Sequence, residues 1–254
     1  MAMTPETPAL TILYRDECLL AVAKPAGLDV FGAPGGREET LCAKLLAQFP
    51  ALAGVGDPRQ PAIVHRLDRG TSGLLLVARD NRTYTSMRSA FASRAISKGY
   101  LALVEGLLEA PVEIDRPIGA RYRRSHKVRV SHDPSRLRSV RPAKTWVKPL
   151  QTAFGFTLCR VHIDTGVRHQ IRAHLAHLGH PVVGDTLYGA QAVVKDLLGR
   201  FFLHAYFAGF SHPAWASPLA LTCPLPGELE AVLAALGVAP GRITAESWAE
   251  GAGR

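Results

Sequence analysis

The segment at residues 65–80, HRLDRGTSGLLLVARD, carries the strongest indications of how this chain folds. Its residues 74–78 (LLLVA) are uniformly apolar and too few to form an exposed element, so they predict a central strand that is covered on both faces. Asp68 then lies on the loop that leads into this strand, between Arg66 and Arg69. A carboxylate is therefore expected at the entrance to a buried strand.

The chemistry expected of Asp68 follows from its neighbours. Arg66 and Arg69, or another arginine brought in by the fold, favour the ionised carboxylate at neutral pH. Such a group suits a nucleophile or a charge stabiliser better than a proton donor. An aspartate in a structural ion pair would have the same local sequence, so this segment alone leaves both interpretations open.

Short strand patterns outnumber helical patterns in the rest of the chain. Further strands are expected at residues 11–14, 19–23, 99–104, 145–150, 156–163, 205–210 and 219–222. Helices are expected from Thr40 to about Phe49, from Asn81 through RTYTSMRSAFAS, and at residues 169–178, with Thr40 and Asn81 as N-caps. Because strands and helices do not alternate one for one, the pattern predicts an α+β fold rather than a doubly wound one.

Length and composition predict one large folded domain. The 254 residues are 47% hydrophobic, which is enough to bury a substantial core. Residues 10–236 are expected to form the domain, with a disordered N-terminus at 1–9 and a flexible tail at 237–254. The four cysteines lie far apart without a C-x-x-C pair, which indicates reduced thiols. With neither an export signal nor a membrane-length apolar run in the sequence, a cytoplasmic protein without membrane contact is expected.

Positive charge is concentrated in one segment, residues 116–148. The chain has a net charge of +9, whereas this segment has eleven Lys and Arg against one acid, Asp133, a net +10 that leaves −1 for the rest. Tyr122, His126 and Trp146 lie among these cations, and rings can stack on unpaired bases while Lys and Arg bind phosphates. Nucleic acid is therefore the favoured partner, although a solvated basic loop would show the same charge run.

The segment HRLDRGTSGLLLVARD resembles the signature of the RluA-type pseudouridine synthases. Five further segments match that family in the same order: KPAGL (24–28), KGYLALVEG (98–106), RPAKT (141–145), TGVRHQIRAHLAHLGHPVVGDTLYG (165–189) and FLHA (202–205). Together they cover about residues 12–226. The resemblance implies a mixed, mainly antiparallel central sheet, flanked by helices and loops and split by an RNA-binding cleft, with residues 10–236 as the catalytic domain.

The resemblance also implies an activity, the isomerisation of specific uridines in rRNA or tRNA to pseudouridine. The N-glycosidic bond breaks, the retained uracil rotates, and it rebonds through carbon 5. Asp68 matches the catalytic aspartate, Tyr100 the tyrosine against the base, and Arg172 the arginine that pairs with the aspartate. Leu203 matches an apolar residue of the same pocket. Since the base is never lost, one carboxylate suffices where glycoside hydrolysis generally needs two, and neither a cofactor nor a metal is expected.

RNA contacts are expected beyond the catalytic residues. A uridine in folded RNA must leave the stack to be reached, and Tyr100 and Leu203 can form the walls of a pocket for it, although both would also suit an ordinary core. The side chains expected to contact RNA are Arg66, Arg121, Arg123, Arg124, Lys127 and Arg168. Metal-ligand spacing is not found among the histidines of the matched segments, which are therefore expected to be solvated or hydrogen-bonded: His65, His169, His174, His177 and His180.

Two features depart from the family pattern. Val167 stands where the family usually has arginine, and an arginine follows at Arg168. Only about nine residues precede the first expected strand, where many relatives carry a small RNA-binding domain, so substrate choice is expected to rest on the catalytic domain of a monomer.

Two other functions stay open at the level of sequence. A catalytically inactive RNA-binding protein would have the same basic segment, but it would have no reason to keep Asp68, Tyr100 and Arg172 together. A nuclease or RNA glycosidase would normally need a cluster of acids or a second carboxylate near Asp68, and the sequence around Asp68 has neither.

Overall fold

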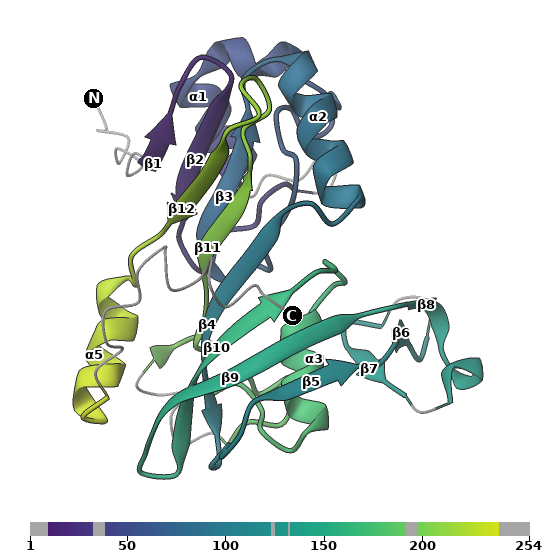
Figure 1. Ribbon diagram of the computed structural model, residues 1–254, viewed down its shortest axis with the longest axis vertical. Helices are drawn as coiled ribbons and strands as arrows, with labels where there is room; N and C mark the ends of the chain where they lie inside the picture. The colour runs from purple at the N-terminus through teal and green to yellow at the C-terminus, as the bar shows by residue number, and fades with distance from the viewer. Residues whose placement is uncertain (1–9, 33–38, 123–124, 132, 192–197, 239–254) are drawn as a thin grey trace, which may run out of the picture.

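A nine-stranded sheet forms the centre of the computed structural model, which describes residues 10–32, 39–122, 125–131, 133–191 and 198–238. The strand order is β1-β2-β3-β11-β4-β10-β9-β5, with β12 paired to β11 (Figure 1). The bounds are β1 Thr11–Arg15, β2 Leu19–Lys24, β3 Ser72–Ala78, β4 Ser97–Glu105, β5 Val112–Asp115, β9 Lys144–Ala153, β10 Phe156–Ile163, β11 Leu203–Ser211 and β12 Pro218–Thr222. Only the β3–β11 pair is parallel among the pairings of these strands. The predicted α+β fold with a mixed, mainly antiparallel sheet is confirmed.

The strand predicted from residues 74–78 is the fully buried strand β3. All seven of its residues are buried, which explains why its sequence is uniformly apolar instead of alternating. Helices α1 (Leu41–Gln48) and α2 (Asn81–Ala92) cover this end of the sheet (Figure 1) and contribute Leu41, Leu45 and Met87 to its core.

Gly73 lets β3 and β11 approach closely where the chain leaves the Asp68 loop. Its φ is +119°, and a Cβ at this position would lie 2.2 Å from the carbonyl oxygen of Ala205. Only glycine fits such a backbone conformation and contact. The loop that carries Asp68 is thereby tied to β11, the strand that begins at Leu203.

A second, three-stranded sheet lies beside helix α3 (Gln170–His177) (Figure 1). Its order is β7-β6-β8, with β6 at Ile118–Ala120, β7 at Val128–Val130 and β8 at Arg138–Arg141. Ile118 and Val128 pack with Ala173 of α3 and with Tyr188 in a small core of their own. At the opposite side of the molecule, helix α5 (Gly227–Ala235) packs Leu229 and Leu233 against the large sheet. Two short 3-10 turns, at Pro50–Gly54 and Pro134–Arg136, complete the described elements.

Each predicted strand is present and begins within two residues of its predicted start. The predicted cap of α2 is wrong, because Asp80 and not Asn81 accepts the hydrogen bond of the Thr83 amide, at 2.8 Å. Strands β5 to β8 and helix α5 were not predicted. The tails predicted at 1–9 and 237–254 lie outside the described residues, except for Gly237 and the buried Val238. Among the described residues, no helix is long and apolar enough to cross a membrane.

Candidate active site

The Asp68 loop is held in place by the KPAGL segment. The amide of Gly27 donates to the carbonyl of Arg69 at 2.8 Å. The ammonium of Lys24 is buried and donates to the carbonyl oxygens of Pro25 (2.8 Å), Leu28 (2.7 Å) and Arg69 (3.2 Å). Burial lowers the pKa of Lys24 to about 8, and these carbonyls replace the water that the ammonium loses. The backbone of the loop is therefore fixed at Arg69, directly after Asp68.

Arg172 of α3 points at Asp68, as the family pattern requires. Its Nη1 lies 3.4 Å from Oδ2 of Asp68. The closer partner is Asp185, which accepts Nε at 2.6 Å on one oxygen and Nη2 at 2.8 Å on the other. Burial alone would lower the pKa of Arg172, but the hydrogen bonds from Asp185 and the charges of both carboxylates raise it. The guanidinium therefore stays charged beside Asp68.

Two aromatic rings complete the surroundings of Arg172. Its guanidinium carbon lies 4.2 Å from the ring centre of Phe201 and 5.1 Å from that of Tyr188. Sequence reasoning assigned no role to Asp185, Tyr188 or Phe201. The GDTLYG segment that contains Asp185 and Tyr188 was part of the matched motif, but nothing in the sequence shows that it folds back onto α3.

Tyr100 and Leu203 lie in the same pocket as Asp68. This pocket has a volume of about 140 Å³, and Arg66, Thr71, Ile163 and residues 166–172 complete its lining. Tyr100 and Leu203 are 9% and 3% exposed, on the neighbouring strands β4 and β11. Burial, and then the charge of Asp68, raise the pKa of Tyr100 well above its ordinary value. Its hydroxyl therefore keeps its proton at neutral pH.

The two arginines that flank Asp68 in sequence have other contacts. The guanidinium of Arg66 lies over the ring of Phe31, 4.9 Å from its centre, at the rim of the pocket. Arg69 pairs with Asp29 at 3.2 Å. Of the two possibilities left open by the sequence, the structure thus brings another arginine, Arg172, to Asp68.

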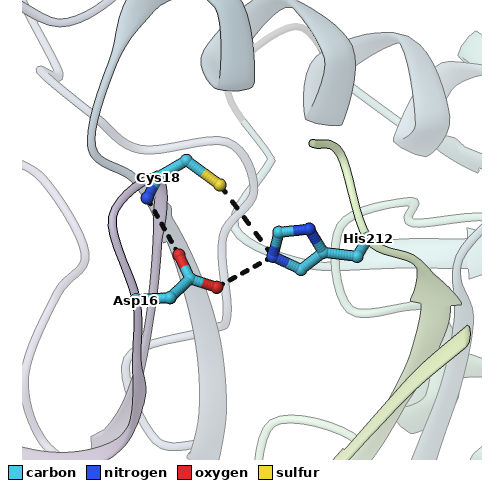
Figure 2. Close-up of side chains that lie close together, drawn as sticks. All are labelled: Asp16, Cys18 and His212. Atoms are coloured by element: carbon cyan, nitrogen blue, oxygen red, sulfur yellow. Dashed lines mark hydrogen bonds and ion pairs between the residues drawn. The ribbon is translucent and has the colours of Figure 1, made fainter. Parts of the chain in front are cut away.

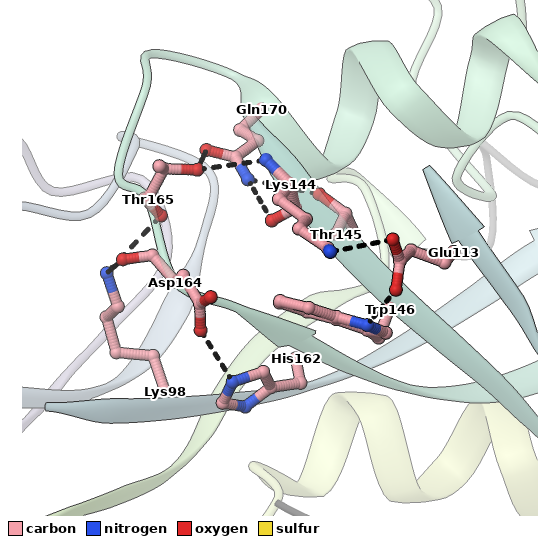
Figure 3. Close-up of polar contacts among 9 residues, drawn as sticks. All are labelled: Lys98, Glu113, Lys144, Thr145, Trp146, His162, Asp164, Thr165 and Gln170. Atoms are coloured by element: carbon pink, nitrogen blue, oxygen red, sulfur yellow. Dashed lines mark hydrogen bonds and ion pairs between the residues drawn. The ribbon is translucent and has the colours of Figure 1, made fainter. Parts of the chain in front are cut away.

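Residues 166–168 form a wall of the pocket. Hydrogen bonds hold this wall and the preceding Asp164 and Thr165 in place, and Figure 3 shows those at Asp164 and Thr165. Lys98 Nζ donates to the carbonyls of Asp164 (3.1 Å) and Thr165 (3.3 Å). The side-chain oxygen of Gln170 accepts from the Thr165 hydroxyl at 2.8 Å and the Val167 amide at 3.1 Å. Its amide nitrogen donates to Lys144 and Thr145 of β9. This pocket wall is therefore anchored to both β9 and β4.

Apart from Arg66, the predicted RNA-contacting side chains that are described lie near the small sheet. Arg168 donates to the carbonyl of Ser125 at 2.5 Å, and Lys127 lies over the ring of Tyr188, 4.9 Å from its centre. Arg121 is exposed and lies over Tyr122. Arg123 and Arg124 lie outside the described residues.

One group of potential metal ligands occurs among the described residues, and it includes none of the histidines of the matched segments. Atoms of Asp16, Cys18 and His212 lie within 4.8 Å of one another (Figure 2). The Ala214 amide donates to Nδ1 of His212 at 3.3 Å, which places the ring proton on Nε2, and Nε2 faces Asp16 Oδ2 at 2.8 Å. A protonated Nε2 has no lone pair for a metal. The group instead joins the β1–β2 turn to the β11–β12 turn.

Several histidines of the matched segments contact separate protein groups. His65 Nε2 accepts the Leu76 amide at 2.8 Å, and burial lowers the pKa of His65 to about 3. His174 lies between the Thr145 hydroxyl and the Arg116 carbonyl, at 2.8 and 3.0 Å. His180 Nδ1 lies 2.9 Å from the carbonyl of Glu105. These rings stabilise the fold around the pocket.

Comparison with known proteins gives the same family as the motifs. A family model described as RNA pseudouridylate synthase matches residues 19–177. An uncharacterized RNA pseudouridine synthase of Chloroflexus aurantiacus is 42% identical over 210 residues, which cover 83% of this chain and 64% of that protein. The ribosomal large subunit pseudouridine synthase D of Xylella fastidiosa is 37% identical over 243 residues, which cover 91% of this chain and 71% of that protein.

Solved structures agree. Human RNA Pseudouridylate Synthase Domain Containing 1 is 26% identical with a TM-score of 0.70, over 94% of this chain and 99% of that one. Human RNA Pseudouridylate Synthase Domain Containing 4 is 25% identical with a TM-score of 0.71, over 89% and 93%. The chain belongs to the RNA pseudouridylate synthase family. The predicted class, an isomerase that makes pseudouridine in RNA, is thereby confirmed.

Proposed function

We propose that this protein isomerises specific uridines of folded RNA at Asp68. The observation that supports this assignment best is the single carboxylate in a small pocket, with Arg172 at 3.4 Å and the protonated Tyr100 in the same lining. A target uridine would leave the RNA stack and enter between Tyr100 and Leu203.

The proposed chemistry needs the carboxylate in its ionised form. Asp68 either attacks the anomeric carbon of the ribose or assists removal of a ribose proton, and in both routes the N-glycosidic bond breaks and its electrons go to the uracil. The retained uracil turns and its carbon 5 bonds to the anomeric carbon, which frees the Asp68 carboxylate in the first route and is accompanied by return of the ribose proton in the second. The proton on carbon 5 then leaves, and N1 of the uracil takes up a proton. Atoms balance without water, because the base and the ribose are rejoined. The charge of Arg172 beside Asp68 favours the required ionised state.

Tyr100 is proposed as the face of the base pocket. Since its raised pKa keeps the phenol protonated, the hydroxyl can donate a hydrogen bond to a uracil oxygen but is not a base at neutral pH. Leu203 supplies the apolar wall on the neighbouring strand.

The substrate proposed first is ribosomal RNA, with tRNA as the other candidate. Relatives from Xylella fastidiosa and Pseudomonas aeruginosa are named ribosomal large subunit pseudouridine synthase D. A monomeric enzyme is proposed, and rRNA as substrate supports action in the cytoplasm.

The deciding experiment compares wild type with Asp68→Asn on RNA labelled with tritium at carbon 5 of uridine. Wild type should release tritium while RNA length and mass are otherwise unchanged, whereas Asp68→Asn should bind RNA normally and release none. Asp57→Asn, which changes the same charge at the pair with Arg59, should keep full activity. Shortened RNA would indicate a nuclease, free uracil a glycosidase, and an inert wild type an RNA-binding protein. Activity of Asp68→Asn within tenfold of wild type would refute the assignment of Asp68.

A further inference from the structure

A second, larger hollow shares a wall with the pocket at Asp68. It has a volume of about 490 Å³ and lies between the small sheet β6–β7–β8 and residues 166–168. The same three residues, Gly166, Val167 and Arg168, also line the pocket at Asp68. Pockets for small molecules typically measure about 300–1,000 Å³, so this hollow, called the flanking pocket below, is large enough for a nucleotide.

The lining of the flanking pocket suits a nucleotide. Val167, which is partly exposed, provides apolar surface that could contact the face of a base, and the buried Ile118 and Val128 lie beneath the hollow. Hydroxyls and guanidinium groups surround it and match base edges and phosphate: Ser125, Ser139, Arg141 and Arg168. The described lining contains no acidic residue, so nothing there repels a phosphate.

The position of the flanking pocket relative to Asp68 is fixed by packing. Its floor, Ile118 and Val128, packs on Ala173 and Tyr188. The Val128 amide donates to the hydroxyl of Tyr188 at 3.1 Å, and the ring of Tyr188 lies against the guanidinium of Arg172. Gln170 accepts the amide of Val167 in the shared wall. Lys98 holds the preceding Asp164 and Thr165 by hydrogen bonds to their carbonyls (Figure 3). A group seated in the flanking pocket would therefore lie at a constant position beside the reacting uridine.

We infer that the flanking pocket receives a nucleotide next to the target uridine in the RNA strand, and so sets the sequence context that the enzyme accepts. The inference rests on the proposed role of Asp68, because it needs the target uridine to occupy the adjoining pocket. A strand that enters one pocket has its neighbouring nucleotide within reach of the other, since the two share three wall residues. The favourable charge and the apolar floor give that nucleotide a place once it is unstacked.

The test uses a short RNA hairpin around a uridine that the wild-type enzyme converts, with an abasic residue introduced on either side of the target. Single-turnover tritium release at saturating enzyme is measured for each RNA. Ala120→Trp fills the flanking pocket from β6, and Arg141→Gln removes its cation without adding bulk. Val140→Trp and Arg129→Gln are the matched controls. Neither control residue lines the flanking pocket. Val140 packs against Gly119 on the face of β6 opposite to that of Ala120, and Arg129 is the strand partner of Gly119.

For the wild type and both controls, one of the two abasic positions should slow conversion at least tenfold. Ala120→Trp and Arg141→Gln should convert the intact hairpin slowly. The abasic residue that slows the wild type should reduce their conversion rate by less than a further twofold. Equal abasic penalties in all five proteins would overturn the inference, as would Ala120→Trp and Arg141→Gln converting the intact hairpin at the wild-type rate. If the wild type releases no tritium from any RNA, so that no convertible uridine can be found for the hairpin, the proposed function is refuted instead. Melting temperatures establish that Ala120→Trp is folded, and Arg141→Gln decides the question if it is not.

Discussion

The guanidinium of Arg172 contacts two carboxylates, those of Asp185 and Asp68. These contacts explain how Arg172 is oriented toward Asp68. Nε and Nη2 are both taken by Asp185, so only Nη1 remains directed at Asp68. The two-point pair with Asp185 fixes the plane of the guanidinium, and Phe201 and Tyr188 restrict its movement on either side. Asp185 is therefore a positioning residue that acts on Asp68 through Arg172.

Asp185→Asn should slow single-turnover tritium release about tenfold or more, with RNA affinity within twofold of wild type. The reason is that an amide cannot accept both N–H groups, so Arg172 turns away from its present direction. Stability should also fall, by about 3 kcal/mol, because a buried pair loses one partner.

A double-mutant cycle separates positioning from a general loss of structure. If Asp185 acts through Arg172, then Asp185→Asn should slow the Arg172→Ala enzyme by less than twofold at a temperature where both are folded. Additive rate losses would contradict the positioning role.

Tyr100→Phe should keep RNA affinity within twofold but slow turnover about tenfold. The ring and its packing remain, while the hydroxyl that donates to the base is lost. Single-turnover rates and equilibrium binding of the two proteins provide the check. A rate equal to that of wild type would limit Tyr100 to packing.

At the residue scale, the sequence was sufficient for the groups that carry a family motif. Asp68, Tyr100, Arg172 and Leu203 were named from it, and the structure brings all four to one pocket. Asp185 could not be recognised in this way, because its contact with α3 depends on how the turn after the helix folds back.

At the scale of elements, the sequence predicted strands that carry their own apolar pattern and missed those that depend on a partner. Residues 74–78 of β3 are uniformly apolar, and β10 was predicted with its observed bounds. Strands β6 and β7 have only three residues each, and β8 is fully exposed. Such segments become strands only by pairing with each other and packing on α3, which no local pattern reports.

Asp16 joins the β1–β2 turn to the β11–β12 turn through His212. Burial alone would raise the pKa of Asp16, but hydrogen bonds from Tyr14, the Cys18 and Leu19 amides and His212 lower it well below its usual value. Its ionised form thus stabilises the fold above the unfolded-state pKa near 3.8, and that contribution is lost as the pH falls through the lower folded-state pKa.

Asp16→Asn should therefore lower the free energy of unfolding at pH 7 by about 1–2 kcal/mol, with a difference that shrinks as the pH falls below about 4. Urea unfolding of the two proteins between neutral and acidic pH measures this difference. The control Glu17→Gln removes a negative charge from the same turn and should change stability by less than about 0.5 kcal/mol. A difference between wild type and Asp16→Asn that is independent of pH would show that the carboxylate charge contributes nothing.

At the scale of the whole molecule, most of the excess positive charge lies in and around the small sheet. The loop that carries Asp68 leads into the large sheet, whereas most of the segment with the net charge of +10 forms the small sheet and its connections, beside the wall of the pocket. Only the end of that segment, from Lys144, belongs to β9 of the large sheet. The sequence predicted a polyanion as partner of this segment but could not show that it folds, because the same charge run suits a solvated loop. The packing of Ile118 and Val128 on Ala173 supplies the missing information.

If this segment docks RNA, replacing Arg121, Arg123, Arg124 and Lys127 by Gln should weaken binding and flatten its dependence on salt. Each phosphate contact contributes a slope of about −0.7 to the logarithmic plot for single strands, so the slope should fall by about two units. Saturating RNA at low salt should restore near-normal turnover, since Asp68, Tyr100 and Arg172 are untouched. The matched control replaces four cations of the β1, α1 and α2 end: Arg15, Lys44, Arg59 and Arg82. It removes the same charge, so an equal loss of slope in both variants would mean that the net charge of the molecule, and not the small sheet, attracts the RNA.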